Sequence, residues 1–549
     1  MGENSNYWTR VRSTPWNRRR FLGAAGATGI GAAGLVMVGC GDDDSDDDGA
    51  DDVGNGSTTP GQSATSAATP RQGGRLTWAD RNEAIWSSAP YGVASYGSAL
   101  FYAFNDTLFR YPKSTLEPEP RLAESYEFNG DETELVVTLK PNIQYQDGSP
   151  IVAQHVIDNF NAINSPDTPN SQSKGPLNQY IASIEAPSDN QVRFKLKRPG
   201  RLVFDALNFL AIIDVKTLQD RLDGKPWNGS GPFRMTEFRP QEGATWEAHK
   251  TFWKPVRLEG VDFRYFADTS ALAAAIETGE VQMTNRLNPD DVTRFAKDKG
   301  FTHVVGTGLT RAFSWGMSAN GEVTKDPRIR RAIHRVIDRK RIAEDVMLGI
   351  YEPRYSLWGP DSLAFEDRYN NDVFNLDEAR QLVAAAGYPD GTPPISLMTQ
   401  NENFEGQRMF EIVQADARQA GLNLEIELVD GAQFSERFQG NDFPGMYQTT
   451  FGFFGMHPDT LPVMNFQVRI PNAAGYTSSR YEKWQADIAA ARTQDERNEL
   501  YREFNSIWDE DIWVFLITDV KDQWVVSKDI AGFAIDNFDV PNWEDVGLA

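Results

Sequence analysis

The side chains that could carry out chemistry are scattered along the chain and form no recognisable catalytic motif. The five histidines show neither the His-x-x-x-His nor the His-Glu-x-x-His spacing that places two zinc ligands on one face of a helix. They are His155, His249, His303, His334 and His457. The run Gly316–Asn320 lacks the last glycine of a Gly-x-Ser-x-Gly nucleophile elbow. We therefore expect a protein that is not an enzyme and that uses no metal or cofactor.

The sequence also bears on two further classes of enzyme, the ATPases and the glycoside hydrolases. It contains no Gly-x-x-x-x-Gly-Lys-Ser/Thr loop, so an ATPase that works with this protein must be another chain. Adjacent acids such as Asp290–Asp291 occur, but any large acidic protein contains such pairs. A secreted glycoside hydrolase with two separated carboxylates stays an alternative, because acids that are distant in sequence show no diagnostic spacing.

Length, charge and cysteine count limit the number of domains and the kinds of partner that this chain can have. The chain has 549 residues, a formal charge of −24 and one cysteine. The length suggests about three domains or lobes. A single cysteine excludes an internal disulfide and a cysteine cluster for zinc. The acidic balance argues against nucleic acid as a partner, since a polyphosphate is bound by a basic face.

The first 70 residues look like a targeting segment followed by a tether. Residues 1–39 are basic, then apolar and rich in Gly and Ala, which is typical of a secretory signal. Arg18–Leu22 resembles the twin-arginine consensus, and Met37–Cys40 resembles a lipobox in which Cys40 is acylated. An uncleaved membrane anchor is the alternative. Residues 41–70 contain eight Asp and no basic residue, so we expect residues 40–70 to be a disordered spacer behind the lipid.

From Arg75 onward the pattern predicts alternating strands and helices, and thus an α/β fold. Residues 135–139, 192–196 and 422–428 read as strands. The segment 326–349 carries one apolar stripe and predicts a single helix that is capped by Asp326 and ended by Gly349. Two further helices are expected to end at Gly387 and Gly421.

Ordered motifs along this body resemble the family 5 solute-binding proteins of bacterial ABC importers, of the oligopeptide, dipeptide and nickel-binding type. They span roughly residues 73–535 and include Leu122–Tyr126, Tyr145–Pro150, Gly229–Phe238, Asp326–Gly349 and Asp377–Gly391. Two departures are visible: Gln154-His155 replaces an acidic pair, and an early Asp-Pro motif is missing.

The resemblance implies a large, type II periplasmic-binding-protein-like fold with two lobes and a ligand cleft between them. Lobe I is expected at residues 71–308, with an extra subdomain at about 105–225, and lobe II at 309–518. Residues 519–549 return to lobe I. The chain is expected to cross between the lobes near 306–310 and 517–520, and hinge closure around a ligand is known for such proteins.

The family also indicates candidate ligand-binding residues. Peptide-binding relatives carry a Gly-Trp-x-x-Asp run whose aspartate pairs with the peptide's amino terminus; here Phe453 keeps the aromatic and Met456 replaces the aspartate. A buried ammonium without a carboxylate is unfavourable, so a free α-amine is not expected there unless Asp459 substitutes. The alternative is a neutral or sugar-like ligand lying on aromatic faces. The aromatic candidates are Trp315, Trp358, Phe453 and Phe454.

Together these expectations describe a monomeric lipoprotein outside the cytoplasm, in the periplasmic space or on the outer face of the membrane. It would capture oligopeptides or a similar small solute and deliver it to an ABC permease that has a separate ATPase. An oligosaccharide or a metal chelate is the alternative cargo. His457 is the one histidine expected near the cleft, and whether His457 or Asp459 contacts the ligand stays open.

Overall fold

The computed structural model describes residues 69–81, 91, 98–112, 115, 117–168, 173–307, 311–401, 403–452 and 457–549. The predicted signal of residues 1–39, Cys40 and nearly all of the predicted tether lie outside these residues. Within the described part of the chain, no helix has the length and apolar character that crossing a membrane requires. Residues 61–549 form one compact unit.

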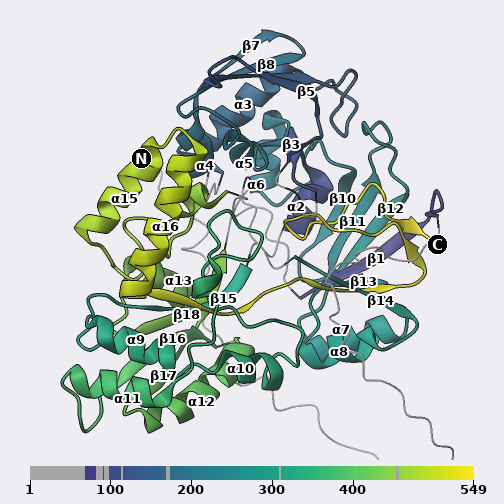
Figure 1. The fold of residues 1–549 in the computed structure, drawn as a ribbon. Helices are drawn as coiled ribbons and strands as arrows, with labels where there is room; N and C mark the ends of the chain where they lie inside the picture. Colours follow the sequence, from purple (N-terminus) through teal and green to yellow (C-terminus); the bar gives the residue numbers. More distant parts are fainter. Residues whose placement is uncertain are drawn as a thin grey trace, which may run out of the picture. The chain divides into compact units, whose positions relative to one another are not determined.

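The first large sheet combines strands from the beginning, middle and end of the described chain (Figure 1). The described residues give it seven strands, in which β1 pairs in parallel with β12 and β13 and the other pairings are antiparallel. In sheet order these are β10 (Phe233–Arg239), β11 (Gly243–Ala248), β12 (Gly260–Tyr265), β1 (Arg75–Asp80), β13 (Met283–Thr284), β20 (Gln523–Ser527) and β14 (Phe301–Val305).

Alternation along the strands explains why this sheet is covered on both faces. Trp524 and Val526 of β20 enter one large core, whereas Val525 between them packs against the helices α7 (Thr269–Glu277) and α8 (Pro289–Ala296) on the other face. Successive side chains of a strand point to opposite faces, so one continuous apolar run can serve two cores. Asn288 caps α8 and Pro289 occupies its first turn.

A second large sheet is built from the later part of the chain (Figure 1). Its described strands number five, with β16 parallel to β17 and β18 and with β15 antiparallel to both of its neighbours. In sheet order these are β17 (Leu424–Val429), β16 (Ile395–Gln400), β18 (Met446–Gly452), β15 (Arg311–Met317) and β19 (Val514–Asp519).

Smaller sheets attach to the first large one. Among described residues, a four-stranded antiparallel sheet has the order β5 (Ala123–Phe128), β6 (Glu134–Leu139), β8 (Gln191–Leu196) and β7 (Ile181–Ser188). Buried positions alternate along β8, as the sequence pattern predicted. They also alternate along β6, which the sequence predicted as a buried strand. Two-stranded pairs are β2 (Asp106–Thr107) with β9 (Ala211–Ile212), β3 (Phe109–Arg110) with β4 (Glu119–Pro120), and β21 (Ile530–Ala531) with β22 (Gly547–Leu548).

The apolar side chains separate into two large cores, which define two lobes. The first lobe is the set of elements that share the core of the seven-stranded sheet, and it includes the four-stranded sheet. The second lobe is the set that shares the core of the five-stranded sheet. The mixed α/β architecture predicted from the sequence is confirmed. The residue boundaries predicted for the lobes stay predictions.

The helices divide between the lobes in the same way. Besides α7 and α8, the first lobe has α2 (Ser98–Phe104), α3 (Ala153–Asn164), α4 (Lys174–Tyr180), α5 (Val203–Leu207), η1 (Val215–Thr217) and α6 (Leu218–Leu222). The second has α9 (Pro327–Arg335), α10 (Arg339–Asp345), η2 (Asp367–Tyr369), α11 (Leu376–Ala385), α12 (Phe404–Gln419), α13 (Gly431–Gly440), η3 (Pro458–Thr460), α14 (Leu461–Met464), α15 (Ser479–Ala490) and α16 (Gln494–Asp511).

The single helix predicted over residues 326–349 is wrong in one respect, because the structure divides it into α9 and α10. The predicted cap is present: the Asp326 side chain accepts a hydrogen bond from the Arg328 amide. The break follows from Asp338, whose side chain accepts from the Arg341 amide and caps a second helix. An aspartate inside an apolar-periodic segment competes for backbone donors in this way and starts a new helix.

Candidate functional site

Two segments lead from one lobe to the other, and described residues on or beside both of them carry polar side chains. One leads from Val305, the last residue of β14, to Arg311, the first of β15. The other leads from Asp519, at the end of β19, to Gln523, at the start of β20. A site that responds to the relative position of the lobes is expected where such segments meet.

Buried charges join the two crossing segments at this point. Arg311 donates a hydrogen bond to Asp522, and the two side chains are 4% and 7% exposed. Asn285 Nδ2 donates to the other oxygen of Asp522 at 3.1 Å. Arg286 Nε lies 3.3 Å from both carboxylate oxygens of Asp80, the last residue of β1, and its Nη1 lies 3.8 Å from Asp522. A continuous set of charges therefore links the end of β1 to the start of β15.

Asp539, from the last part of the chain, completes a set of charged residues with Asp80, Arg286, Arg311 and Asp522, which we call the hinge cluster. Its Oδ1 accepts from the Thr307 amide at 3.0 Å, and its Oδ2 lies 3.9 Å from Arg311. Burial, followed by repulsion from Asp522, raises the pKa of Asp539 above its ordinary value, although Arg311 opposes this. A Cβ atom on Gly306 would lie 2.4 Å from Asp539 Oδ1, so only glycine permits this approach.

A second contact between the lobes lies outside the crossing segments. Asp205, on α5 of the first lobe, accepts hydrogen bonds from the His457 main-chain amide at 2.9 Å and the Tyr111 hydroxyl at 2.8 Å. The His457 ring Nδ1 lies 3.1 Å from Asp205 Oδ1. Helices α4 and α14 also contact one another beside it. We call Asp205 and His457 the interlobe pair.

The interlobe pair favours a protonated imidazole. Burial by itself lowers the pKa of His457, but the charge of Asp205 and the hydrogen bond to it outweigh burial, and the pKa is raised. Asp459 adds to this effect and Arg497 opposes it. The protonated ring therefore strengthens the attachment of the second lobe to Asp205.

Asp459, the residue that could substitute for the missing aspartate, is 1% exposed and already has partners within the second lobe. Arg497 Nε lies 3.1 Å from its Oδ2, and the Tyr501 hydroxyl donates to its Oδ1. Burial raises the pKa of Asp459, and Tyr501 and Arg497 oppose that rise. Its charge is therefore balanced by Arg497, and a contact between Asp459 and a ligand stays a prediction.

The two described aromatic candidates lie in the core of the second lobe. Trp315 is fully buried on β15, with ring centroids 6.3 Å from those of Phe410 and Phe515. Trp358 is 4% exposed and donates from Nε1 to Asn505 Oδ1 at 2.7 Å. Their role in ligand binding stays a prediction. Phe453, Phe454 and Met456 lie outside the described residues.

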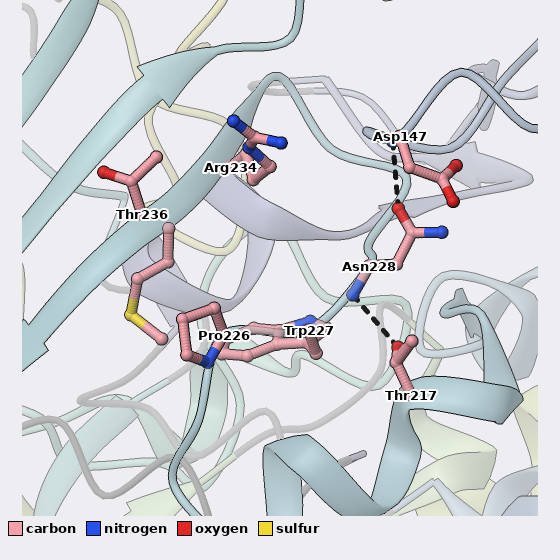
Figure 2. A pocket seen from close by; sticks show the side chains of 8 residues that line it. Asp147, Thr217, Pro226, Trp227, Asn228, Arg234 and Thr236 are labelled. Atoms are coloured by element: carbon pink, nitrogen blue, oxygen red, sulfur yellow. Dashed lines mark hydrogen bonds between the residues drawn. The ribbon is translucent and has the colours of Figure 1, made fainter.

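An open cavity of about 400 Å³ lies on the first lobe (Figure 2). Asn228 holds its wall: Oδ1 accepts from the Asp147 amide at 3.1 Å and the Asn228 amide donates to Thr217 Oγ1 at 3.0 Å. Arg234 from β10 and Trp227 also line it. None of Trp315, Trp358 and Asp459 contributes to this cavity.

The charged groups described at these contacts connect the two lobes. Among the residues that the structure describes, no group of three His, Cys, Asp or Glu side chains could hold a metal ion. The charged side chains at both contacts are paired with one another across segments that are distant in sequence. Such contacts can stabilise one relative position of the lobes.

Two α/β lobes with this topology define the class of type II periplasmic binding proteins. The DppA protein of Helicobacter pylori in complex with the peptide STSA has a TM-score of 0.74 at 20% identity, over 87% of this chain and 98% of that one. AppA of Bacillus subtilis in complex with a nonapeptide has a TM-score of 0.74 at 20% identity, covering 88% and 100%. These likenesses confirm the predicted fold class.

A family model described as bacterial extracellular solute-binding proteins, family 5 middle, matches residues 117–470. The chain belongs to this family, whose members are extracytoplasmic substrate-binding proteins of ABC importers. It is 24% identical over 433 residues to the glutathione-binding protein GsiB of Salmonella typhi, covering 75% of this chain and 83% of GsiB. The family assignment made from the sequence motifs is confirmed.

Several residues of the two contacts were missed by sequence reasoning. Arg311, Asp522 and Asp539 come together from three separate segments, and Asp205 meets His457 across 252 positions. A single sequence carries no spacing signal for such pairs. The one available sign was that Arg311 and Asp522 lie next to the predicted crossings.

Proposed function

We propose that this protein is a lipid-anchored solute-binding protein that captures oligopeptides or a similar small solute between its lobes. It hands the solute to an ABC permease whose ATPase is a separate chain. The chain belongs to family 5 of the solute-binding proteins. The observation that carries this proposal is its pair of lobes, which are joined by two crossing segments and are in contact again through Asp205 and His457. A ligand favours that contact only through its higher affinity for the closed arrangement.

Peptide cargo is supported by the relatives. GsiB is named for glutathione, which is a tripeptide, and solved neighbours hold the peptide STSA and a nonapeptide. A further neighbour, NikA of Brucella suis, was solved with Fe(III)-EDTA at a TM-score of 0.75 and 19% identity, covering 87% of this chain and all of that one. A metal chelate is therefore the second candidate. Met456 stands where peptide-binding relatives have an aspartate, so the carboxylate that would favour a peptide amine is missing at this position.

Thermal unfolding with pooled ligands tests the cargo. A ligand at 100 times its Kd stabilises the native state by about 2.7 kcal/mol, which raises Tm by several degrees. We expect pooled short peptides to raise Tm, with pooled oligosaccharides and Fe(III)-EDTA as comparison arms. Mass spectrometry of the compound that co-purifies identifies it. An unchanged Tm with every peptide pool contradicts peptide cargo.

The lipid anchor is tested separately through Cys40. Acyl chains hold a protein to a membrane by about 0.8 kcal/mol per buried methylene group, so more than one chain anchors it stably. We expect the mature protein to begin at an acylated Cys40 and the Cys40→Ser variant to leave the membrane fraction. Replacement of Arg18 and Arg19 by Lys should block export. Unchanged membrane association of Cys40→Ser would favour an uncleaved anchor.

We infer that capture occurs without chemical change, as the related binding proteins suggest. Prolonged incubation with the co-purified compound, followed by mass spectrometry, should return the compound intact. Steady formation of a cleavage product would support the hydrolase alternative. Heat-denatured protein is the control for spontaneous breakdown.

A further inference from the structure

Arg221, on α6 of the first lobe, is a buried cation that has no carboxylate partner among the described residues. Arg221 is 3% exposed, and its Nε and Nη1 atoms have no hydrogen-bond partner among the described residues. Its neighbours are aromatic: the guanidinium carbon lies 4.4 Å from the ring centroid of Trp227 and 5.4 Å from that of Phe101. Burial lowers the pKa of Arg221 to about 9, which reflects how poorly this site stabilises the charge.

A buried arginine of the second lobe shows what a structural role looks like in the same molecule. Arg330 is also 3% exposed, but it donates to the carbonyl groups of Asp511 at 2.6 Å, Thr324 at 3.1 Å and Lys325 at 2.9 Å. Its Nη2 lies 3.5 Å from the Asp511 carboxylate. Buried guanidinium groups are normally satisfied in this way. Arg221 makes no such hydrogen bonds from Nε and Nη1 in the described part of the chain, so these two donors are available to a further partner.

Asn208, directly after α5, has the same property. It is 2% exposed, and neither Oδ1 nor Nδ2 has a hydrogen-bond partner in the described part of the chain. Its main-chain carbonyl accepts from the Tyr102 hydroxyl at 3.0 Å, so the residue itself is held in place. A carboxamide offers an acceptor and two donors side by side, which is the complement of an amide group.

The two groups contact neighbouring aromatic residues of α2, and Asn208 lies close to Asp205 of the interlobe pair. Phe101 and Tyr102 of α2 are in edge-to-face contact at 5.2 Å; Phe101 contacts Arg221, and Tyr102 binds Asn208. Asn208 follows Asp205 by three positions in helical conformation, so both lie on the same side of α5. Asp205 contacts the second lobe through His457, which places Asn208 on the side of the first lobe that faces the second.

We propose that Arg221 and Asn208 are ligand-binding residues of the first lobe that take a solute with a carboxylate close to an amide group, as at the C-terminal end of a peptide. The carboxylate pairs with Arg221, and the amide pairs with the Asn208 carboxamide. This inference rests on the proposed function and narrows its cargo. Lobe closure then covers a ligand that is already anchored through its acidic end.

Equilibrium dialysis with two matched probes tests this proposal. The probes are a pool of random tripeptides with free carboxylates and the same pool amidated at the C-terminus, each measured by mass spectrometry after dialysis against the purified protein. We expect the free-acid pool to be retained at least about tenfold better than the amidated pool, as for a charge-assisted hydrogen bond. Arg221→Met should remove this preference. Asn208→Ala should weaken retention of both pools about threefold to tenfold.

Thermal unfolding without ligand separates a binding role from a structural one. Arg221→Met replaces an unpaired buried charge by an apolar side chain, so its Tm should equal or exceed that of the unchanged protein. The matched control, Arg330→Met, should lower Tm and keep the preference for free carboxylates.

A carboxylate preference that persists in Arg221→Met overturns the proposal, and so does a fall in its Tm like that of Arg330→Met. Unchanged retention of both pools by Asn208→Ala overturns the role of Asn208. Failure of the unchanged protein to retain either pool contradicts the peptide cargo of the proposed function itself, and this inference with it.

Discussion

The two contacts between the lobes use different chemistry. The hinge cluster is formed by arginines and aspartates on or beside the crossing segments, and the Arg311–Asp522 ion pair is almost fully buried. The interlobe pair lies elsewhere and depends on an imidazole, with His457 14% exposed at its side chain. An arginine stays charged at every physiological pH, whereas an imidazole changes its charge near neutrality.

This difference indicates a division of roles. The hinge cluster holds together segments that stay connected in any position of the lobes, so it should contribute mainly to stability. The interlobe pair joins α5 to the start of η3, which only lobe contact brings together, so it should contribute mainly to ligand affinity. Variants at the two contacts can therefore confirm or contradict the comparison.

The largest expected effect is on stability, in Asp522→Asn. This change leaves Arg311 buried without the carboxylate that it contacts most closely, and removing one partner of a buried ion pair costs about 3–5 kcal/mol. The free energy of unfolding in urea measures it. Glu499→Gln, which removes an exposed partner of Arg502, is the control and should cost less than about 1 kcal/mol. Equal effects of the two changes would contradict the structural role of the hinge cluster.

A smaller effect, on binding, is expected for Asp205→Asn. The asparagine keeps the shape but loses the charge that faces His457, so the closed arrangement loses a charge-assisted hydrogen bond. Affinity for the co-purified ligand should fall about tenfold, by calorimetry. Glu185→Gln, on the exposed face of the four-stranded sheet, should leave the affinity unchanged. If Asp205→Asn binds as tightly as the unchanged protein, the interlobe pair does not support closure.

The smallest effect is the pH dependence of affinity. The contact with Asp205 raises the pKa of His457 above its ordinary value of about 6.5. The contribution of the interlobe pair to ligand affinity is therefore complete below about pH 6.5 and is lost as the pH rises through the raised pKa. Affinity should therefore be higher at pH 6 than at pH 9, by less than the loss in Asp205→Asn. The other polar groups that face this contact are Asp205, Tyr111, Tyr180, Asp459, Arg497 and Tyr501.

The same titration sharpens the comparison between the contacts. Asp205→Asn should lose the pH dependence in this range, because the partner that raises the pKa of His457 is gone. Glu185→Gln should keep it. If the pH dependence of affinity persists in Asp205→Asn, another titrating group causes it. Asp539 in the hinge cluster is then the first candidate, because burial raises its pKa.

Local pattern was enough to predict much of the fold. The alternation in residues 192–196 gave β8, and Gly387 and Gly421 adopt the positive φ that follows a helix end. The break between α9 and α10 was missed because the apolar stripe continues through it, while the Asp338 cap depends on one side chain. Ordered motifs predicted the family, which also set the two-lobed architecture.

The site was less accessible to sequence reasoning. Asp459 was named as a candidate ligand-binding residue, and this stays a prediction. Its pairing with Arg497 depends on the contact of α16 with η3, which no local pattern encodes. Arg221 and Asn208 carry no motif, and they become noticeable only when burial and hydrogen bonding are compared across the molecule. Sequence predicts elements from local periodicity, whereas a binding site depends on contacts between distant segments.

The place of β20 has a consequence for how the protein is made. This strand comes from the last 30 residues, yet it lies between β13 and β14, and β14 has no other partner strand in the described sheet. While the chain emerges from the ribosome, the first lobe therefore cannot complete its sheet until β20 has been made, and β20 follows all strands of the second lobe. The second lobe has all of its strands earlier and can fold before it. Deletion of β20 should consequently leave the sheet of the first lobe incomplete.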